Sequence, residues 1–172
     1  HADAHTTEAV EATWWHPETA LADWERGELQ LMAPTIWNLR ELAALSRRTG
    51  ISTSVELEGS FDALTASQRI ALLRVLQEAL SNIRYHSGSR EVAVLLREKA
   101  FKGVCMEIRD DGRGFDPDAV VPAEDGESGI GLVGMRERLR LLGGRLEIES
   151  APGGPTTLRA TLPHWLPLAQ SA

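Results

Sequence analysis

The chain has 172 residues, 42% hydrophobic and 25% charged, a size and composition that predict one globular domain with a substantial core. Its net charge of −7 provides no broad basic surface, so nucleic acid is not an expected partner. A single cysteine, Cys105, excludes a disulfide framework and a cysteine-rich zinc site, and no stretch reaches the roughly 18 to 20 apolar residues of a membrane helix.

The N-terminal part of the chain carries little regular pattern. Because the chain begins at His1 and not at Met, we expect it to be part of a longer protein, and whether that protein is anchored in a membrane stays open. The domain itself is expected in the cytoplasm. Residues 1–30 hold three of the five tryptophans in a polar, acidic setting without clean periodicity. We interpret them as an extension, either a helical remnant or a tail.

Residues 34–57 predict a helix followed by a strand. Apolar residues recur at helical spacing over residues 34–48, and Gly50 is a plausible C-terminal stop, so the helix should end near Thr49. Residues 51–57 then alternate in character, as a half-buried strand does. The face expected to be buried carries Ile51, Thr53, Val55 and Leu57.

A long helix is predicted over residues 66–85. Thr65 and Gln68 have the spacing of a capping box, in which each side chain hydrogen-bonds a backbone N–H of the other residue. On a helical wheel one side is apolar and the other polar. The apolar arc consists of Leu72, Val75, Leu76, Ala79, Leu80 and Ile83, and the polar stripe of Arg74, Glu78, Asn82 and Tyr85.

The remaining chain predicts two strand pairs around one helix. Residues 91–97 and 104–109 should form an antiparallel hairpin, and residues 115–128 should form a loop or lid. An amphipathic helix follows, marked by apolar residues from Leu132 to Leu142 and closed by two glycines. Two more strands are predicted at residues 145–149 and 156–162. This order favours an antiparallel or mixed sheet with helices on one face.

Three short segments could carry chemistry, and the first is a pair of side chains on the long helix. Glu78 and Asn82 lie four residues apart, so both project from one face about one turn apart. A carboxylate and an amide placed in this way can hold a hydrated magnesium ion beside substrate phosphates. The alternative is a solvated polar face with no ligand.

The second segment ends the first hairpin with two acids and two glycines. Asp110 and Asp111 precede Gly112 and Gly114. Glycines at a strand end let a ligand approach the backbone, and a buried carboxylate there can accept hydrogen bonds from an exocyclic amine. An Asp-Gly turn without a ligand is the alternative.

The third segment is a glycine run directly before the predicted second amphipathic helix. Gly126, Gly129, Gly131 and Gly134 would expose backbone N–H groups to an anion at a helix N-terminus. No short strand-and-turn precedes the run and no Gly-Lys-Ser/Thr is present, so neither a dinucleotide-binding fingerprint nor a P-loop explains it.

Taken together and in this order, the segments resemble the GHKL ATPase superfamily, most closely histidine kinases of the nitrate-sensor and lipid-stress type. Residues 77–82 with His86 resemble the N box of that family, residues 110–115 its G1 box and residues 129–138 its G2 box. The resemblance covers about residues 31–163. It implies a histidine-kinase-like ATPase domain over residues 31–164, with a C-terminal tail at 165–172.

The resemblance implies an α/β two-layer sandwich of the Bergerat type, with a mixed, mostly antiparallel sheet, helices on one face and an ATP lid. The expected cofactors are ATP and Mg²⁺. Asp110 would accept from the adenine amino group, Asn82 would coordinate magnesium, and Glu78 would order the waters of the metal or the nucleophile. The implied ATP-binding residues are Asn82, Arg84, Tyr85, His86, Asp110, Gly112, Gly114, Gly129, Ile130, Gly131, Leu132, Val133, Gly134 and Thr156.

Two positions depart from the family pattern. The family usually has Lys or Arg just before His86 to meet a phosphate, and this chain has Tyr85. A neutral phenol does not replace a cation, so Arg84 is the expected substitute. Pro155 stands where the family usually has Gly before Thr156, which stiffens the backbone beside the predicted base pocket.

A third departure concerns the phosphoacceptor, a His followed by an acid in the family. His5 precedes Thr6 and His16 precedes Pro17, so neither matches. The expected partners are therefore a dimerisation and phosphotransfer segment of the same or another kinase and, through the intact kinase, a response regulator. Residues 1–30 would be at most a remnant of the dimerisation helix, and the isolated domain is expected to be a monomer. The alternatives are an anti-sigma-type serine kinase and a nucleotide-binding module without transfer activity.

Overall fold

The computed structural model describes residues 15–28, 33–59, 61, 63–99, 103–119 and 130–164. The elements in chain order are α1 (Pro17–Glu25), α2 (Ala33–Thr49), β1 (Ser52–Glu58), α3 (Ala66–Asn82), the π-helical turn η1 (Ile83–Ser87), β2 (Glu91–Lys99), β3 (Gly103–Asp110), α4 (Ile130–Leu141), β4 (Arg145–Ser150) and β5 (Thr156–Leu162). Among these residues, no helix is both long and apolar enough to span a bilayer.

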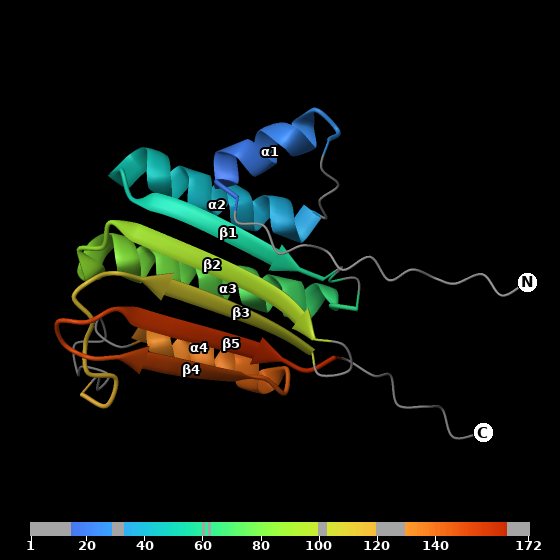
Figure 1. Cartoon of the computed structure of the whole chain (residues 1–172). Coiled ribbons are helices and arrows are strands. Elements are labelled where there is room, and N and C mark those ends of the chain that lie inside the picture. The colour runs from blue at the N-terminus through green and yellow to red at the C-terminus, as the bar shows by residue number, and fades with distance from the viewer. Residues whose placement is uncertain are drawn as a thin grey trace, which may run out of the picture.

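The five strands form one mixed sheet in the order β1-β2-β3-β5-β4. β1 and β2 are parallel because the chain crosses over through α3 between them, whereas β2–β3 and β4–β5, each joined by only a few residues, are antiparallel. β3 and β5 also pair in the antiparallel sense and join the two hairpins. Figure 1 shows α2, α3 and α4 covering one face of this sheet. The predicted α/β two-layer sandwich is confirmed.

The core lies between the sheet and the apolar side of α3. All six residues of the predicted apolar arc of α3 are buried, with Val75 and Leu76 fully so. They meet the inward residues of the central strands, such as Val94 and Met106. Each such side chain contributes about 1.5 to 3 kcal/mol of transfer free energy on burial. The periodicity of the sequence therefore fixed which side of α3 faces the sheet.

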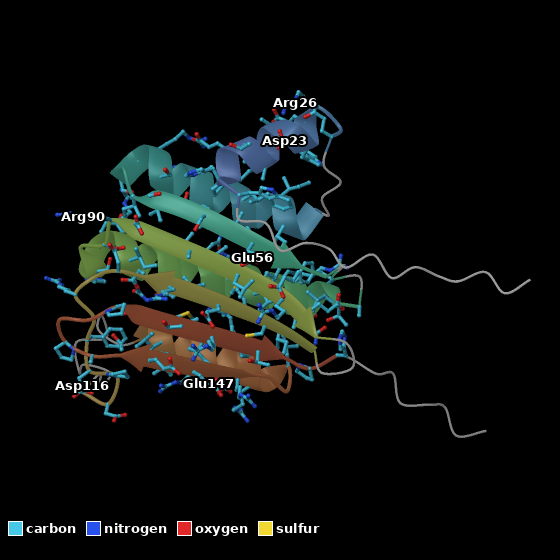
Figure 2. All side chains as sticks on the ribbon, in the orientation of Figure 1. Asp23, Arg26, Glu56, Arg90, Asp116 and Glu147 are labelled. Atoms are coloured by element: carbon cyan, nitrogen blue, oxygen red, sulfur yellow. The ribbon has the colours of Figure 1, made fainter. Side chains whose placement is uncertain are left out.

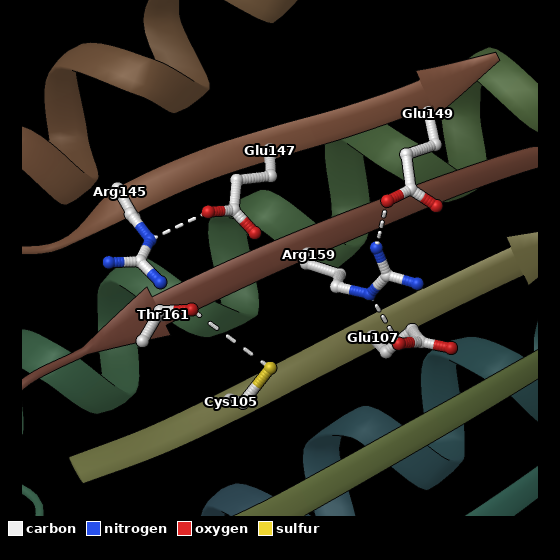
Figure 3. A network of polar contacts seen from close by, with 7 residues as sticks. All are labelled: Cys105, Glu107, Arg145, Glu147, Glu149, Arg159 and Thr161. Carbon is white, nitrogen blue, oxygen red and sulfur yellow. Dashed lines mark hydrogen bonds and ion pairs between the residues drawn. The ribbon is translucent and has the colours of Figure 1, made fainter. Parts of the chain in front are cut away.

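The other face of the sheet is hydrophilic. Arg159 on β5 pairs with Glu107 at 2.7 Å and with Glu149 at 2.5 Å, and Arg145 pairs with Glu147 at 2.8 Å along β4 (Figure 3). Such partly exposed ion pairs contribute only about 0 to 1 kcal/mol each. Acidic side chains extend to both edges of the sheet, with Glu56 on β1 and Glu147 on β4 (Figure 2). Glu56 is nevertheless buried, at 6% exposed, so this face is not uniformly open to solvent.

The described part of the predicted N-terminal extension packs on the domain. Trp15 exchanges two backbone hydrogen bonds with Val55, at 2.8 and 2.9 Å, on the outer edge of β1. Helix α1 follows, with Pro17 at its first turn, and buries Ala20 in the core. Its relation to a dimerisation helix stays a prediction. Residues 1–14 and 165–172 lie outside the described residues.

Two segments differ in detail from the sequence-based expectation. The helix predicted over residues 66–85 is α-helical to Asn82 and continues as η1. Helix α4 begins at Ile130, so Gly131 and Gly134 lie inside its first turns and not before the helix as predicted. The positions of glycines in the sequence do not show where a helix begins, because packing against neighbouring elements also sets that boundary. Most of the predicted lid, residues 120–128, lies outside the described residues.

Candidate functional site

A cavity of about 610 Å³ opens between α3, η1, the loop after β3, the start of α4, and the inner faces of β4 and β5. This volume lies within the range of small-molecule sites. Eight of the site residues predicted from sequence line it, although they come from stretches of the chain that lie far apart in sequence. They are Glu78, Asn82, His86, Asp110, Gly114, Gly131, Leu132 and Thr156.

The long helix supplies one wall of this cavity. The predicted capping box is present: Gln68 N donates to Thr65 Oγ1 at 3.2 Å, and Thr65 N donates to Gln68 Oε1 at 3.0 Å. This cap fixes where α3 begins and so sets the phase of the helix. Glu78 and Asn82 then fall on its cavity side, one turn apart and both only partly exposed.

A buried carboxylate forms part of the cavity wall. Asp110, at the end of β3, is only 5% exposed, and its Oδ1 accepts a hydrogen bond from Gly112 N at 2.9 Å. Burial raises the pKa of Asp110, which the hydrogen bond from Gly112 partly opposes and the charge of Asp111 reinforces. In the described part of the chain Oδ2 has no hydrogen bond, so it can accept one from a ligand.

The neighbouring Asp111 has a different role, which sequence reasoning did not assign. One oxygen, Oδ1, accepts from Ser89 Oγ at 2.6 Å, Arg90 N at 2.8 Å and Glu91 N at 2.9 Å. These bonds, led by that from Ser89, lower the pKa of Asp111 to about 2. Asp111 therefore ties the loop after β3 to the start of β2, and Asp110 is left to face the cavity.

The two glycines of this loop allow it to pack closely against neighbouring segments of the chain. A Cβ added to Gly112 would lie 2.7 Å from Ser87 Cβ, and one added to Gly114, whose φ is +54°, would lie 2.1 Å from the carbonyl oxygen of Ala151. Any other residue at either position would force the loop away from η1 or from the β4–β5 turn. Gly112 itself does not line the cavity.

Thr156, on the β5 side of the cavity, is linked to the same loop through hydrogen bonds of Ser150. Its Oγ1 lies 2.9 Å from Ser150 Oγ, which also accepts from Phe115 N at 3.0 Å. Pro155 precedes it in the exposed β4–β5 turn. The hydroxyl expected beside the base is thus connected to the loop that carries Asp110.

The N-terminus of α4 approaches the polar side of α3. An added Cβ at Gly131 would lie 2.0 Å from Glu78 Oε1, so a larger residue here would displace the carboxylate of Glu78 from its present position. The first backbone N–H groups of a helix have no partner within the helix and favour anions. Gly131 and Leu132 bring this end of α4 to the cavity. Gly129 and the side chain of Ile130 lie outside what the structure describes.

Five predicted positions do not line the cavity. Arg84 is exposed and stacks over the ring of Tyr85, with its guanidinium carbon 4.8 Å from the ring centre. Tyr85 is 64% exposed and Val133 50% exposed, because successive residues of a helical turn point in different directions and each of these two points away from a lining neighbour. The positions off the wall are Arg84, Tyr85, Gly112, Val133 and Gly134.

One charged residue of the wall was missed by sequence reasoning. Arg113 lines the cavity, and its Nε donates to the backbone carbonyl of His86 at 2.7 Å. Its position between the two glycines of the loop was the signal available in the sequence. The other unpredicted lining residues are Ala79, Ile83, Ser87, Ile108, Phe115, Ile148 and Leu158.

Comparison with known proteins places these features in a family. Residues 67–166 match the model described as histidine kinase-, DNA gyrase B-, and HSP90-like ATPase. The chain is 39% identical over 118 residues to the sensor histidine kinase MctS of Rhizobium johnstonii, covering 69% of this chain and 25% of that protein. It is 36% identical over 115 residues to the histidine-protein kinase/phosphatase DegS of Brevibacillus brevis, covering 67% and 28%.

The structural comparison agrees on the fold. The histidine kinase AdeS of Acinetobacter baumannii superposes with a TM-score of 0.59 at 13% identity, covering 86% of this chain and 75% of that one. The chain spans about a quarter of the length of the two curated relatives.

Proposed function

The chain belongs to the family of histidine kinase-, DNA gyrase B-, and HSP90-like ATPases, and from this premise we propose that it binds Mg-ATP and supplies the γ-phosphoryl group for phosphorylation of a histidine. The acceptor would lie on a dimerisation segment of the same or a partner kinase, and the phosphoryl group would pass on to a response regulator. Sensor kinases among its relatives support this reading.

The observation that carries the proposal is the buried carboxylate of Asp110 in a cavity that Glu78 and Asn82 also line. A free carboxylate oxygen suits the amino group of adenine. With the base held there, the phosphates extend towards α3 and the free N–H groups at the start of α4. One cavity therefore offers a site for each end of ATP.

The donor set suits magnesium. Asn82 and Glu78 offer an amide oxygen and a carboxylate, and within the described residues no group of three or more His, Cys, Asp or Glu could hold a metal alone. Magnesium keeps several waters and shares its remaining positions with phosphates, so two protein oxygens suffice. When bound, the ion would neutralise charge on the phosphates.

The transfer step needs little covalent chemistry from the protein. The acceptor imidazole nitrogen forms a bond to the γ-phosphorus while the bond to the bridging oxygen breaks and ADP leaves. The transition state is loose, so catalysis depends mainly on how the protein positions the reacting groups. The N-terminus of α4 would hold the phosphate chain in line, Asn82 would hold the metal ion, and Glu78 would order water or accept a proton beside the nucleophile.

Calorimetric titration with a non-hydrolysable ATP analogue, with and without magnesium, tests the binding step. We expect Asp110→Ala to weaken binding by about 10- to 100-fold, because an acceptor for the base is lost. Asn82→Ala should remove most of the magnesium dependence while leaving metal-free binding unchanged. A folded wild-type chain that binds no nucleotide would contradict the proposal.

Transfer is tested with labelled ATP and an added dimerisation segment from a relative. The expected product is a phosphoramidate, which acid destroys and alkali preserves. An acid-stable phosphoryl group would identify the serine-kinase alternative, and tight binding without any transfer to a competent acceptor would identify a binding module.

A further inference from the structure

The cavity presents an electrostatic problem for its proposed ligand. Two of its lining residues, Glu78 and Asp110, are acids, and the whole chain carries a net charge of −7. A nucleoside triphosphate is strongly anionic, and like charges at close range disfavour binding. A cation in the wall would offset this repulsion, and the expected position before His86 holds the neutral Tyr85.

Arg113 is the only lysine or arginine among the described residues that line the cavity. Its backbone is held on both sides: its N donates to the carbonyl of Ser87 at 2.9 Å, and its carbonyl accepts from Gly153 N at 2.6 Å. The side chain is held as well, because Nε donates to the His86 carbonyl at 2.7 Å. The guanidinium is thereby fixed at the η1 side of the cavity, one turn beyond Asn82.

The two terminal nitrogens of this guanidinium are available to a ligand. In the described part of the chain no carboxylate forms an ion pair with Arg113, whereas Arg97, Arg140 and Arg159 each have a glutamate partner. A planar guanidinium binds phosphate through two parallel hydrogen bonds, and one already anchored through Nε loses less freedom on binding.

We propose that Arg113 binds the phosphate chain of the nucleotide and supplies the cation that position 85 lacks. This inference rests on the proposed function and assigns a residue to its site. Arg84, the substitute expected from sequence, is turned outward onto the Tyr85 ring and lies off the cavity wall.

The test is a set of affinities for adenosine, AMP, ADP and ATP, measured by calorimetry on the 172-residue chain and on Arg113→Gln. We expect Arg113→Gln to weaken the binding of ATP and ADP by about 10- to 100-fold and the binding of adenosine by less than about 2-fold. The ATP affinity of the variant should also depend less on salt. Arg113→Lys, which keeps the charge, should recover part of the loss.

Arg109→Gln is the matched control, because it makes the same change of charge four residues earlier. Arg109 lies on β3 between the inward residues Ile108 and Asp110, so its side chain is on the opposite, exposed face of the sheet. We expect wild-type affinities for all four ligands, and thermal unfolding of each variant checks that it is folded.

Three results would overturn the inference. An equal loss of affinity for adenosine and for ATP in Arg113→Gln would mean that Arg113 only holds η1 in place through His86. Unchanged ATP affinity in that variant, with a loss in Arg84→Gln, would assign the cation to Arg84. Both leave the proposed function intact, whereas a wild-type chain that binds neither adenosine nor ATP removes the function and the inference together.

Discussion

At the scale of single residues, two adjacent aspartates have opposite environments. Asp110 continues the inward alternation of β3 and is buried, so its pKa is raised. Asp111 lies just beyond the strand, on the exposed side, where three donors lower its pKa to about 2. A raised pKa means that ionised Asp110 costs folding free energy, whereas ionised Asp111 contributes it. The first residue is thus suited to a ligand and the second to the loop.

We predict that Asp111→Ala lowers the free energy of unfolding at pH 7 by about 1 to 2 kcal/mol, because three donors lose their acceptor and water replaces it only in part. The stabilisation by Asp111 is present above its ordinary pKa of 3.8 and is lost as the pH falls from there towards 2. Urea unfolding at pH 7 and at stepwise lower pH should show the difference from wild type shrinking.

The control for this prediction is Asp118→Ala, which removes an exposed carboxylate farther along the same loop. We expect a change within about 0.5 kcal/mol. A loss at Asp111 that stays constant down to pH 2.5 or so would contradict a role for its charge.

At the scale of elements, α3 connects the cap, the core and the site. Gln68, at its start, is 1% exposed, completes the capping box and donates through Nε2 to the carbonyl of Pro163 at 2.7 Å, just beyond β5. The same helix carries Glu78 about three turns later and Asn82 about four turns later. A change at the cap therefore affects how α3 packs against the sheet as well as where α3 begins.

We predict that Thr65→Ala lowers the free energy of unfolding by about 1 kcal/mol, the typical cost of losing an N-cap. For a chain of this size the melting temperature should fall by about 2 to 4 °C. Thr65→Ser, which keeps the hydroxyl acceptor, should lose less than half as much. Calorimetric melting of the three proteins measures this, and equal losses for Ala and Ser would argue against the cap.

At the scale of the whole molecule, the cavity is assembled from both ends of the domain sequence. The polar side of α3 and the strands β4 and β5 are far apart in the sequence, and the sheet order places β5 beside β3 so that Thr156 faces Asp110 across one register pair. A ligand that contacts all these parts stabilises the folded state as one unit.

We predict that saturating Mg-ATP raises the melting temperature of the chain. At a ligand concentration 100 times the Kd, linkage gives about 2.7 kcal/mol, or roughly 5 to 10 °C for a domain of this size. Scanning calorimetry at several ATP concentrations measures the shift. Asp110→Ala should show a smaller shift at the same concentration, and an equal shift in both proteins would place the ligand elsewhere.

Much of the fold could be predicted from the sequence because it depends on local patterns. The alternation of residues 51–57, the capping box at Thr65 and the apolar arc of α3 all predict the elements found. The start of α4 was predicted too late, and η1 not at all, because helix boundaries depend on packing between elements that a local pattern does not record.

The sequence by itself determined the order of the main helices and strands, the buried sides of β1 and α3, and the three segments that contribute to the site. Only the tertiary structure decided which residues of those segments line one cavity: it includes Asp110 and Arg113 and leaves out Arg84 and Tyr85. Periodicity reports the direction of a side chain relative to its own element. It does not report how far η1 turns or which loop lies across it, because contacts between residues distant in sequence set that geometry.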